Sequence, residues 1–410
     1  MKSSKFIYLI LLGTIVTDSL RIITSAGFLT SGNSTYYIAF LNYFVLILMI
    51  YVANKGRKNA IIPKKINILF LLWFVINIIN LFRSFFVAQD YWDWRFLLLT
   101  SFSFSFIPLA FYYGFDSDNI KSAFKFVLKY LFPFGFIIIP LALITTSQLY
   151  PRLMIMVSFF LLFIPYMKAR YRLVVITVAV VSILVAIGFR TNLIKIGFSI
   201  ILLILWNFRN NIKISWLKVL HTILFVMPLV FLSLAIWGDY NIFQEISSNS
   251  SDYYVGGSTE EAKDLLGDSR TFLYVEVLAQ LDYTNVWILG ESSIGSYEST
   301  FGNQGGAIGG KRYGSEVGIL NILLKYGLLG VISYFFLLYF VSYYAIFHSN
   351  NFLSKMIGLG IAFRWPLMFI EEYTQFDLNF LFFWMIIGLV SSELFRSLSD
   401  ENISGYFEFD

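Results

Sequence analysis

The chain has no cysteine and only two histidines among its 410 residues. The absence of cysteine excludes a disulfide framework, a thiol nucleophile and a thiolate metal site. The two histidines, His221 and His348, lie far apart in the sequence without a partner that would make a catalytic dyad or a metal site. Charged residues amount to 13%, well below the roughly 25% that is usual for soluble domains. The composition therefore excludes an ordinary soluble protein, and no nucleic-acid-binding signature is present.

Hydrophobic residues make up 58% of the chain, and 45 residues are phenylalanine. They form runs of about 17–25 residues without strand-like alternation, which predicts membrane-spanning helices. The first run has no clear small-residue cleavage site, so we interpret it as a retained span. The sequence predicts an all-α polytopic membrane protein of about twelve spans. They are residues 5–23, 36–53, 66–88, 96–114, 123–146, 152–167, 172–189, 192–208, 216–237, 317–347, 352–371 and 378–396.

The distribution of lysine and arginine supports this arrangement. With a cytoplasmic N-terminus, the predicted cytoplasmic regions hold most of the basic residues outside the large loop, as the positive-inside rule requires. The short loops on the other side hold only three, namely Arg95, Arg152 and Arg190. We therefore expect a multi-pass protein of the cytoplasmic membrane with both termini in the cytoplasm.

One long polar segment interrupts the hydrophobic runs, at residues 238–316. It holds many of the acidic residues and glycines of the chain but only four basic residues, Lys263, Arg270, Lys311 and Arg312. The predicted organisation is nine spans within residues 1–237, a large outer loop at 238–316, three spans within 317–396 and a cytoplasmic tail at 397–410. A glycine-rich loop without a GxxxxGK[ST] motif does not indicate a nucleotide site, but it could form a lid over a substrate.

Several charged residues fall near the predicted outer ends of spans, where charge is costly unless it faces a cavity or a partner. They are Asp18, Arg21, Arg83, Arg190, Lys195, Lys325, Arg364, Glu371 and Glu372. A basic pocket that opens outward and takes an anionic headgroup explains them together. The alternative for each single residue is snorkelling to the interface without a specific partner.

Two arginines stand out by their surroundings. Arg190 lies at a junction between spans, in IGFRTNLIKI, where Thr191 and Asn192 can cap the next helix. Arg270 opens a helix-like stretch, SRTFLYVEVLAQL, with an apolar face that includes Leu273 and Val277. A guanidinium can bind phosphate oxygens through two parallel hydrogen bonds. A polar turn and a solvated docking helix are the structural alternatives.

Glu316 stands where the tenth span begins, so its carboxylate suits the helix macrodipole. The same position at a cavity mouth makes it a candidate base that orients or deprotonates an acceptor hydroxyl. Arg83, Lys311, Arg312 and Arg364 are the candidate substrate-binding residues. No metal or cofactor site is predicted.

The architecture and the motifs IGFRTNLIKI, GDSRTFLYVEVL, ILGESSIGSY and SEVGILNILLKYGLLG together resemble the bacterial O-antigen polymerases (Wzy-type), which are related to the O-antigen ligases. The motif resemblance covers about 187–200 and 267–333. It implies a glycosyltransferase that moves a glycan from a polyprenyl-diphosphate carrier to a lipid-linked repeat unit outside the cytoplasmic membrane. The implied partners are these lipid-linked oligosaccharides, membrane lipid and a chain-length regulator protein.

Within this resemblance, Arg190 and Arg270 would neutralise the diphosphate, both on binding and as the leaving group gains charge. Ligases carry a histidine just before the span that contains GLLG. This chain has Tyr313, Gly314, Ser315 and Glu316 there, which favours a polymerase. A flippase or exporter for lipid-linked oligosaccharides is the alternative from another class, although such transporters usually consist of two similar halves and no internal repeat is visible.

Overall fold

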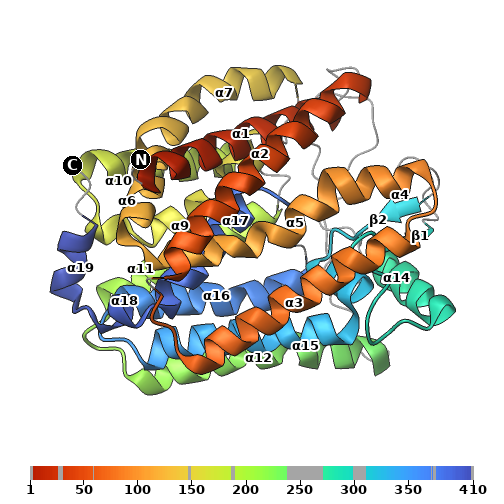
Figure 1. The fold of residues 1–410 in the computed structure, drawn as a ribbon. Coiled ribbons are helices and arrows are strands. Elements are labelled where there is room, and N and C mark those ends of the chain that lie inside the picture. The colour runs from red at the N-terminus through yellow and green to blue at the C-terminus, as the bar shows by residue number, and fades with distance from the viewer. Residues whose placement is uncertain are drawn as a thin grey trace, which may run out of the picture.

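The computed structural model describes residues 3–25, 31–58, 60–145, 149–185, 190–237, 271–298, 311–370, 372 and 375–407. These residues form a bundle of long helices whose axes run in roughly the same direction (Figure 1). The first half comprises α1 (Ser3–Ser25), α2 (Ser31–Arg57), α3 (Lys64–Val87), α4 (Tyr91–Phe96), η1 (Leu97–Ser101), α5 (Phe102–Phe106), η2 (Ile107–Phe115), α6 (Ser117–Phe126), η3 (Val127–Leu131), α7 (Phe132–Thr145), α8 (Leu149–Met154), α9 (Val157–Leu161) and η4 (Ile164–Tyr166). The second half comprises α10 (Ala169–Val185), α11 (Arg190–Asn207), α12 (Ile214–Trp237), α14 (Thr271–Thr284), β1 (Ser296–Glu298), β2 (Lys311–Tyr313), α15 (Gly318–Phe347), α16 (Phe352–Ile370), α17 (Leu378–Ser391), α18 (Glu393–Ser397) and α19 (Asp400–Tyr406).

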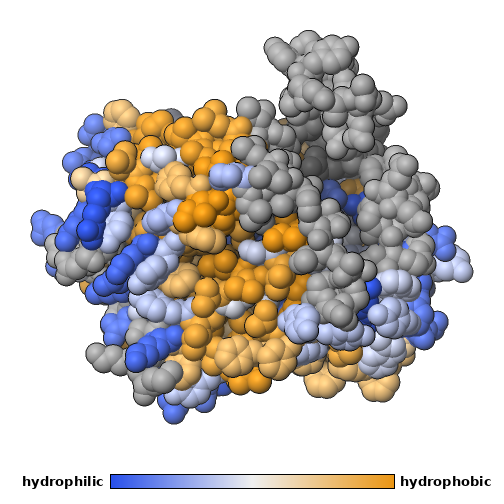
Figure 2. Space-filling model, turned by 90° about the horizontal axis from the view of Figure 1, so that it is seen from above, coloured by the Kyte–Doolittle hydropathy of each residue, from blue (hydrophilic) through white to orange (hydrophobic). Residues whose placement is uncertain are grey.

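The predicted all-α membrane class is confirmed. Within the described ranges, eight helical segments are long and apolar enough to cross a membrane, and three shorter apolar helices join them. Every predicted span coincides with helical structure, but the sixth, at residues 152–167, consists of the short helices α8, α9 and η4. The number of twelve crossings therefore stays a prediction. Figure 2 shows hydrophobic residues across the middle of one face and hydrophilic residues towards its ends, as in a protein that crosses a bilayer.

The two ends of the bundle differ in what they carry. The start of α1 and the C-terminal helix α19 lie at one end, and α14, β1 and β2 lie at the other (Figure 1). We call the second end the hairpin end, because β1 and β2 pair there as an antiparallel two-stranded sheet. It is the end at which the sequence predicts the outer loop.

Helix α17 is the centre of the core, since all of its residues are buried. Its sequence is almost wholly apolar, so it needs no polar face. It packs closely on η2 at two glycines, Gly114 and Gly388. A Cβ at Gly388 would collide with the carbonyl oxygen of Phe111, and one at Gly114 with the backbone of α17. Small residues at both positions therefore let the two backbones approach.

Helix α15 is interrupted at Gly327, whose φ of 63° and ψ of −166° are not helical. The predicted span 317–347 is present as this helix, which is long and apolar enough to cross a membrane. The break at Gly327 is a feature that the sequence analysis does not predict. The segment 286–292 lies against the break and replaces the missing hydrogen bonds of the helix. The carbonyls of Leu324 and Lys325 accept from the amides of Glu291 and Ser292, and the amides of Leu328 and Leu329 donate to the carbonyls of Trp287 and Ile288. The irregular backbone is thus satisfied by protein, as the membrane interior requires.

The helix predicted after Arg270 is present as α14. Its apolar face, formed by Leu273, Val277 and Leu281, is buried. The hydroxyl of Tyr274 donates to the carbonyl of Phe369 over 2.6 Å, which ties α14 to the end of α16. The described part of the outer segment is therefore built onto the bundle.

Candidate functional site

Glu372 is the centre of a buried group of charges at the hairpin end. It follows α16, and its side chain is 4% exposed. One carboxylate oxygen lies 2.9 Å from Nζ of Lys195, near the start of α11, and the other pairs with the guanidinium of Arg364 on α16. Burial opposes the charged form, yet Arg364 and Lys195 together hold the pKa of Glu372 below its ordinary value. One carboxylate thus joins two cations from different helices.

Arg364 is fully engaged by its neighbours. Its second terminal nitrogen donates to Oδ1 of Asn379 over 2.9 Å. The guanidinium also lies over the rings of Phe159 and Phe383, at 5.0 and 4.9 Å from the ring centroids. A guanidinium in contact with two aromatic rings and bound to two polar side chains has a fixed orientation. In this structure Arg364 therefore positions Glu372.

Two acidic residues continue the group towards α1. Asp377 caps α17 by accepting from the amide of Phe380 over 2.8 Å, and burial raises the pKa of its carboxyl. Asp18 of α1 accepts from the amide of Leu378, and Arg21 of α1 donates to the carbonyl of Phe376. Asp18, Arg21, Asp377 and Arg152 of α8 line one small cavity.

We call these seven residues the outer charge cluster, because the sequence predicts the outer loop at this end: Asp18, Arg21, Arg152, Lys195, Arg364, Glu372 and Asp377. It contains four cations and three carboxylates, so one positive charge is left over when all are ionised. Such a group in an apolar bundle is costly unless it serves a partner or a function. Its chemistry suits an anion that approaches from the hairpin end, because charge interactions are strong where water is scarce.

Arg83 of α3 binds backbone groups of the segment 286–292. It donates to Oδ1 of Asn80 over 2.7 Å and to the carbonyls of Leu289 and Gly290 over 3.0 Å each. These carbonyls belong to the segment that fills the break in α15. Arg83 therefore clamps this segment onto α3, and its predicted role in substrate binding is not tested by these contacts.

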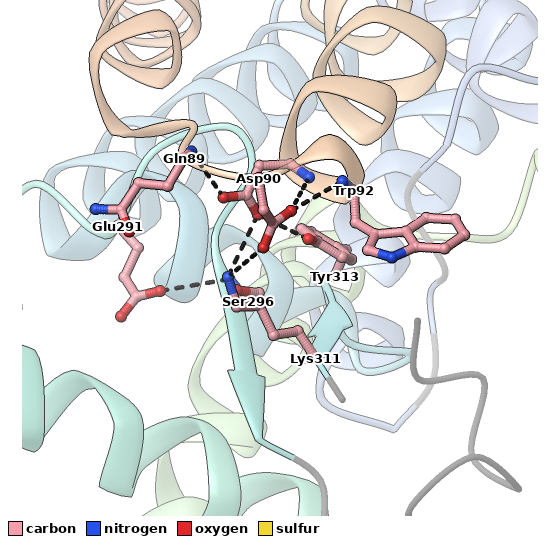
Figure 3. A network of polar contacts seen from close by, with 8 residues as sticks. Gln89, Asp90, Trp92, Glu291, Ser296, Lys311 and Tyr313 are labelled. Atoms are coloured by element: carbon pink, nitrogen blue, oxygen red, sulfur yellow. Dashed lines mark hydrogen bonds and ion pairs between the residues drawn. The ribbon is translucent and has the colours of Figure 1, made fainter. Parts of the chain in front are cut away.

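Lys311 of β2 lies in a polar network that connects the hairpin to the start of α4 (Figure 3). Its Nζ is 3.1 Å from Oδ2 of Asp90 and 3.6 Å from Oδ1 of Asp93. Partial burial opposes its charge, but the two carboxylates raise the pKa of Lys311. The hydroxyl of Tyr313 donates to Asp93 over 2.7 Å, and burial together with this contact raises the pKa of Tyr313. The network fixes the hairpin at the start of α4.

Arg312 and Glu316 pair with each other, over 2.9 Å. The Glu316 side chain is 51% exposed, whereas that of Arg312 is 11% exposed. The backbone carbonyl of Glu316 accepts from the amide of Glu372, which places this pair next to the outer charge cluster. Glu316 is thus accessible, as an acceptor-orienting carboxylate must be, but its charge is already compensated.

Lys325 is a buried cation of a different kind. It lies in the last turn before the break in α15 and is 5% exposed. Among the residues that the structure describes, its Nζ has no carboxylate or hydrogen-bond acceptor. It lies 5.4 and 5.8 Å from the ring centroids of Phe96 and Phe104. The rings and the carbonyl end of a half-helix are what stabilise it.

The structure describes only the backbone of one of the two arginines that the sequence favours. Arg190 is the first residue of α11, at the hairpin end of that helix. It precedes Lys195 by five residues in the sequence. Arg270 lies outside the described residues, directly before α14. Lys195, Glu372 and Lys325 are among the charges that the sequence analysis assigns to an outward pocket, but they are not among its candidate catalytic or substrate-binding residues. Only the three-dimensional arrangement shows that Glu372 joins Lys195 to Arg364.

Comparison of the chain with protein-family models, with curated proteins and with solved structures gives no match. The chemistry of the residues and the resemblance of the motifs are therefore what supports a function.

Proposed function

We propose that the chain is a polysaccharide repeat-unit polymerase of the O-antigen polymerase kind. It transfers a glycan from a polyprenyl-diphosphate carrier to a repeat unit on a second carrier, at the outer face of a bacterial cytoplasmic membrane. The outer charge cluster is the observation that supports this most, because it places surplus positive charge at the hairpin end of an apolar bundle. A lipid-linked diphosphate has the matching form: its tail stays in lipid while its anionic head reaches that end.

The proposed roles combine the resemblance of the motifs with the positions of the residues along the chain. Arg190, which begins α11 near Lys195, and Arg270, which precedes α14, contact the diphosphate and stabilise the departing charge. Arg364 acts indirectly, because its guanidinium is engaged by Glu372 and Asn379. Glu316 is accessible and orients the acceptor hydroxyl. A chain-length regulator protein is a further proposed partner.

The test is complementation of a strain that lacks this chain. Arg190→Ala and Arg270→Ala are expected to abolish long polymer while single repeat units still reach the cell surface. Lys213→Ala, which removes an exposed cation from the predicted cytoplasmic side, is the control and should restore the full polymer ladder. Normal ladders from well-expressed Arg190→Ala and Arg270→Ala variants would remove both residues from the mechanism.

The break in α15 favours a second candidate, a flippase or exporter, because interrupted helices often form the substrate sites of transporters. In those sites the freed backbone groups contact the ligand. Here four of them bond to residues 286–292 instead. A strain without a flippase should have no repeat units outside the membrane, whereas a strain without a polymerase should have single units there. Polymer that accumulates on the carrier lipid would indicate a ligase.

A further inference from the structure

The largest groove for which the structure gives lining residues lies away from the outer charge cluster, between α6, η3 and α7 on one side and α10 on the other. Its volume is about 400 Å³. Three of its lining residues are basic, namely Lys125, Lys129 and Arg170, and none of the described lining residues is acidic. We infer that this groove binds the phosphate headgroup of an anionic phospholipid.

A proline explains why a groove is present at this point. Pro133 has no amide hydrogen to donate to the carbonyl four residues earlier, and its ring crowds that carbonyl. The preceding turn, η3, is a π-helix in which the amide of Phe132 donates to the carbonyl of Val127. Such a wider turn accommodates the proline. Lys129 lies within this turn and Pro133 is the second residue of α7, which follows it, and both line the groove.

The three cations are available to a ligand. Lys125, Lys129 and Arg170 are all exposed. Arg170 donates to the hydroxyl of Tyr171 over 2.9 Å and lies over its ring, which orients the guanidinium. A single exposed lysine on a membrane helix is adequately explained by snorkelling. Three cations from two separate helices that share one groove repel each other, and a bound phosphate offsets this repulsion.

The apolar surroundings favour a lipid over a free phosphate ion. Leu128 and Val174 line the groove beside the cations. Exposed apolar side chains continue from it along the neighbouring helices, with Phe134 and Ile137 on α7 and Leu173 on α10. Acyl chains can lie along these residues while the headgroup stays among the cations. The groove lies towards the end that carries α19 and the start of α1 (Figure 1), where the sequence predicts the cytoplasmic leaflet, which is rich in anionic lipid.

The experiment measures lipid retained by the purified full-length chain. The protein in detergent is titrated with phosphatidylglycerol or phosphatidylcholine, and bound lipid is counted by native mass spectrometry. We expect the wild type to retain phosphatidylglycerol in preference. The variant Lys125→Gln/Lys129→Gln/Arg170→Gln should bind it at least about tenfold more weakly. The control Lys213→Gln/Lys218→Gln removes two exposed lysines outside the groove and should behave as the wild type.

Equal phosphatidylglycerol binding by the groove variant and the control would overturn the inference. Full displacement of the lipid by millimolar inorganic phosphate would show an ordinary phosphate site and would equally overturn it. If the triple variant does not elute as a folded species, Lys125→Gln/Lys129→Gln provides the same comparison, because both side chains are exposed. The lipid-binding measurement does not depend on polymer synthesis, so its outcome neither supports nor contradicts the proposed function.

Discussion

Replacing Glu372 by glutamine should be among the most destabilising conservative changes in this protein. Glutamine keeps the shape of the side chain but leaves Lys195 and Arg364 buried without a carboxylate between them. At the observed 2.9 Å, the attraction between Lys195 and Glu372 is about 6 kcal/mol at an effective dielectric constant of about 20. Much of it offsets the cost of taking the charges out of water, so the pair itself adds little net stability.

Removing only the carboxylate lowers the stability strongly, because the desolvation cost of the two cations remains. Removal of one partner of a buried pair typically costs about 3–5 kcal/mol. The melting temperature falls by about 2–4 °C per kcal/mol of lost stability in domains of about 150–250 residues, and by less in a longer chain. We therefore expect the melting temperature of Glu372→Gln to fall by about 5–10 °C. The double variant Lys195→Met/Glu372→Gln removes one of the two uncompensated cations. It should therefore be more stable than Glu372→Gln alone.

The assay is thermal unfolding of the purified protein in detergent, followed by tryptophan fluorescence. Glu316→Gln is the matched control, since it breaks a half-exposed pair worth at most about 1 kcal/mol. A melting temperature of Glu372→Gln within about 2 °C of the wild type would refute the reasoning, and so would a double variant that is no more stable than the single one.

The pH dependence has a definite sign. The folded-state pKa of Glu372 lies below the ordinary value of 4.5. Its contribution is therefore fully present above that value and is lost as the pH falls through the lower, folded-state value. The variant Glu372→Gln should show a smaller loss of stability on acidification than the wild type.

Further changes test the packing at the hairpin end and in the core. Arg83→Lys cannot bind both carbonyls with one planar fork, so the amides of Leu328 and Leu329 should exchange with deuterium at least about tenfold faster, as measured by hydrogen-exchange mass spectrometry. Gly388→Ala should abolish the folded, monodisperse species in size-exclusion chromatography, because its Cβ collides with η2. Gly197→Ala on α11, where a Cβ meets nothing within 4 Å, should be neutral or stabilising by up to about 1 kcal/mol. Lys311→Ala removes a half-exposed ion pair and should shift the melting temperature by no more than about 2 °C.

The sequence predicts the membrane class and the positions of the helices because both depend on local composition. A long run of apolar residues must be helical in lipid, whatever its neighbours are. The break at Gly327 could not be predicted in this way. A glycine inside a membrane helix usually serves close packing, and the segment that fills the break lies about 35 residues earlier in the chain. Its hydrogen bonds with α15 are long-range and leave no periodic signal.

The candidate site shows the same division. A charge within an apolar run, such as Lys195 or Arg364, is conspicuous in the sequence. Its partner is not, because Glu372 meets Lys195 only after α11 and α16 have packed together. Arg83 is equally conspicuous, but in the structure its guanidinium binds backbone carbonyls. The sequence therefore identifies which charged residues are energetically costly to bury. Only the packing of the helices determines which partners these residues bind.

The distribution of cations also predicts how salt affects the proposed reaction. Lys311 is half-exposed and already paired with two aspartates, so mobile ions screen it and it adds little attraction for a diphosphate. Lys195, Arg364 and Lys325 are buried, and ions in solution screen them far less. Transfer measured in membranes with a lipid-linked substrate should therefore change less than about threefold between 50 and 500 mM sodium chloride. A drop of more than tenfold would mean that half-exposed cations such as Lys311, and not these three buried cations, attract the substrate.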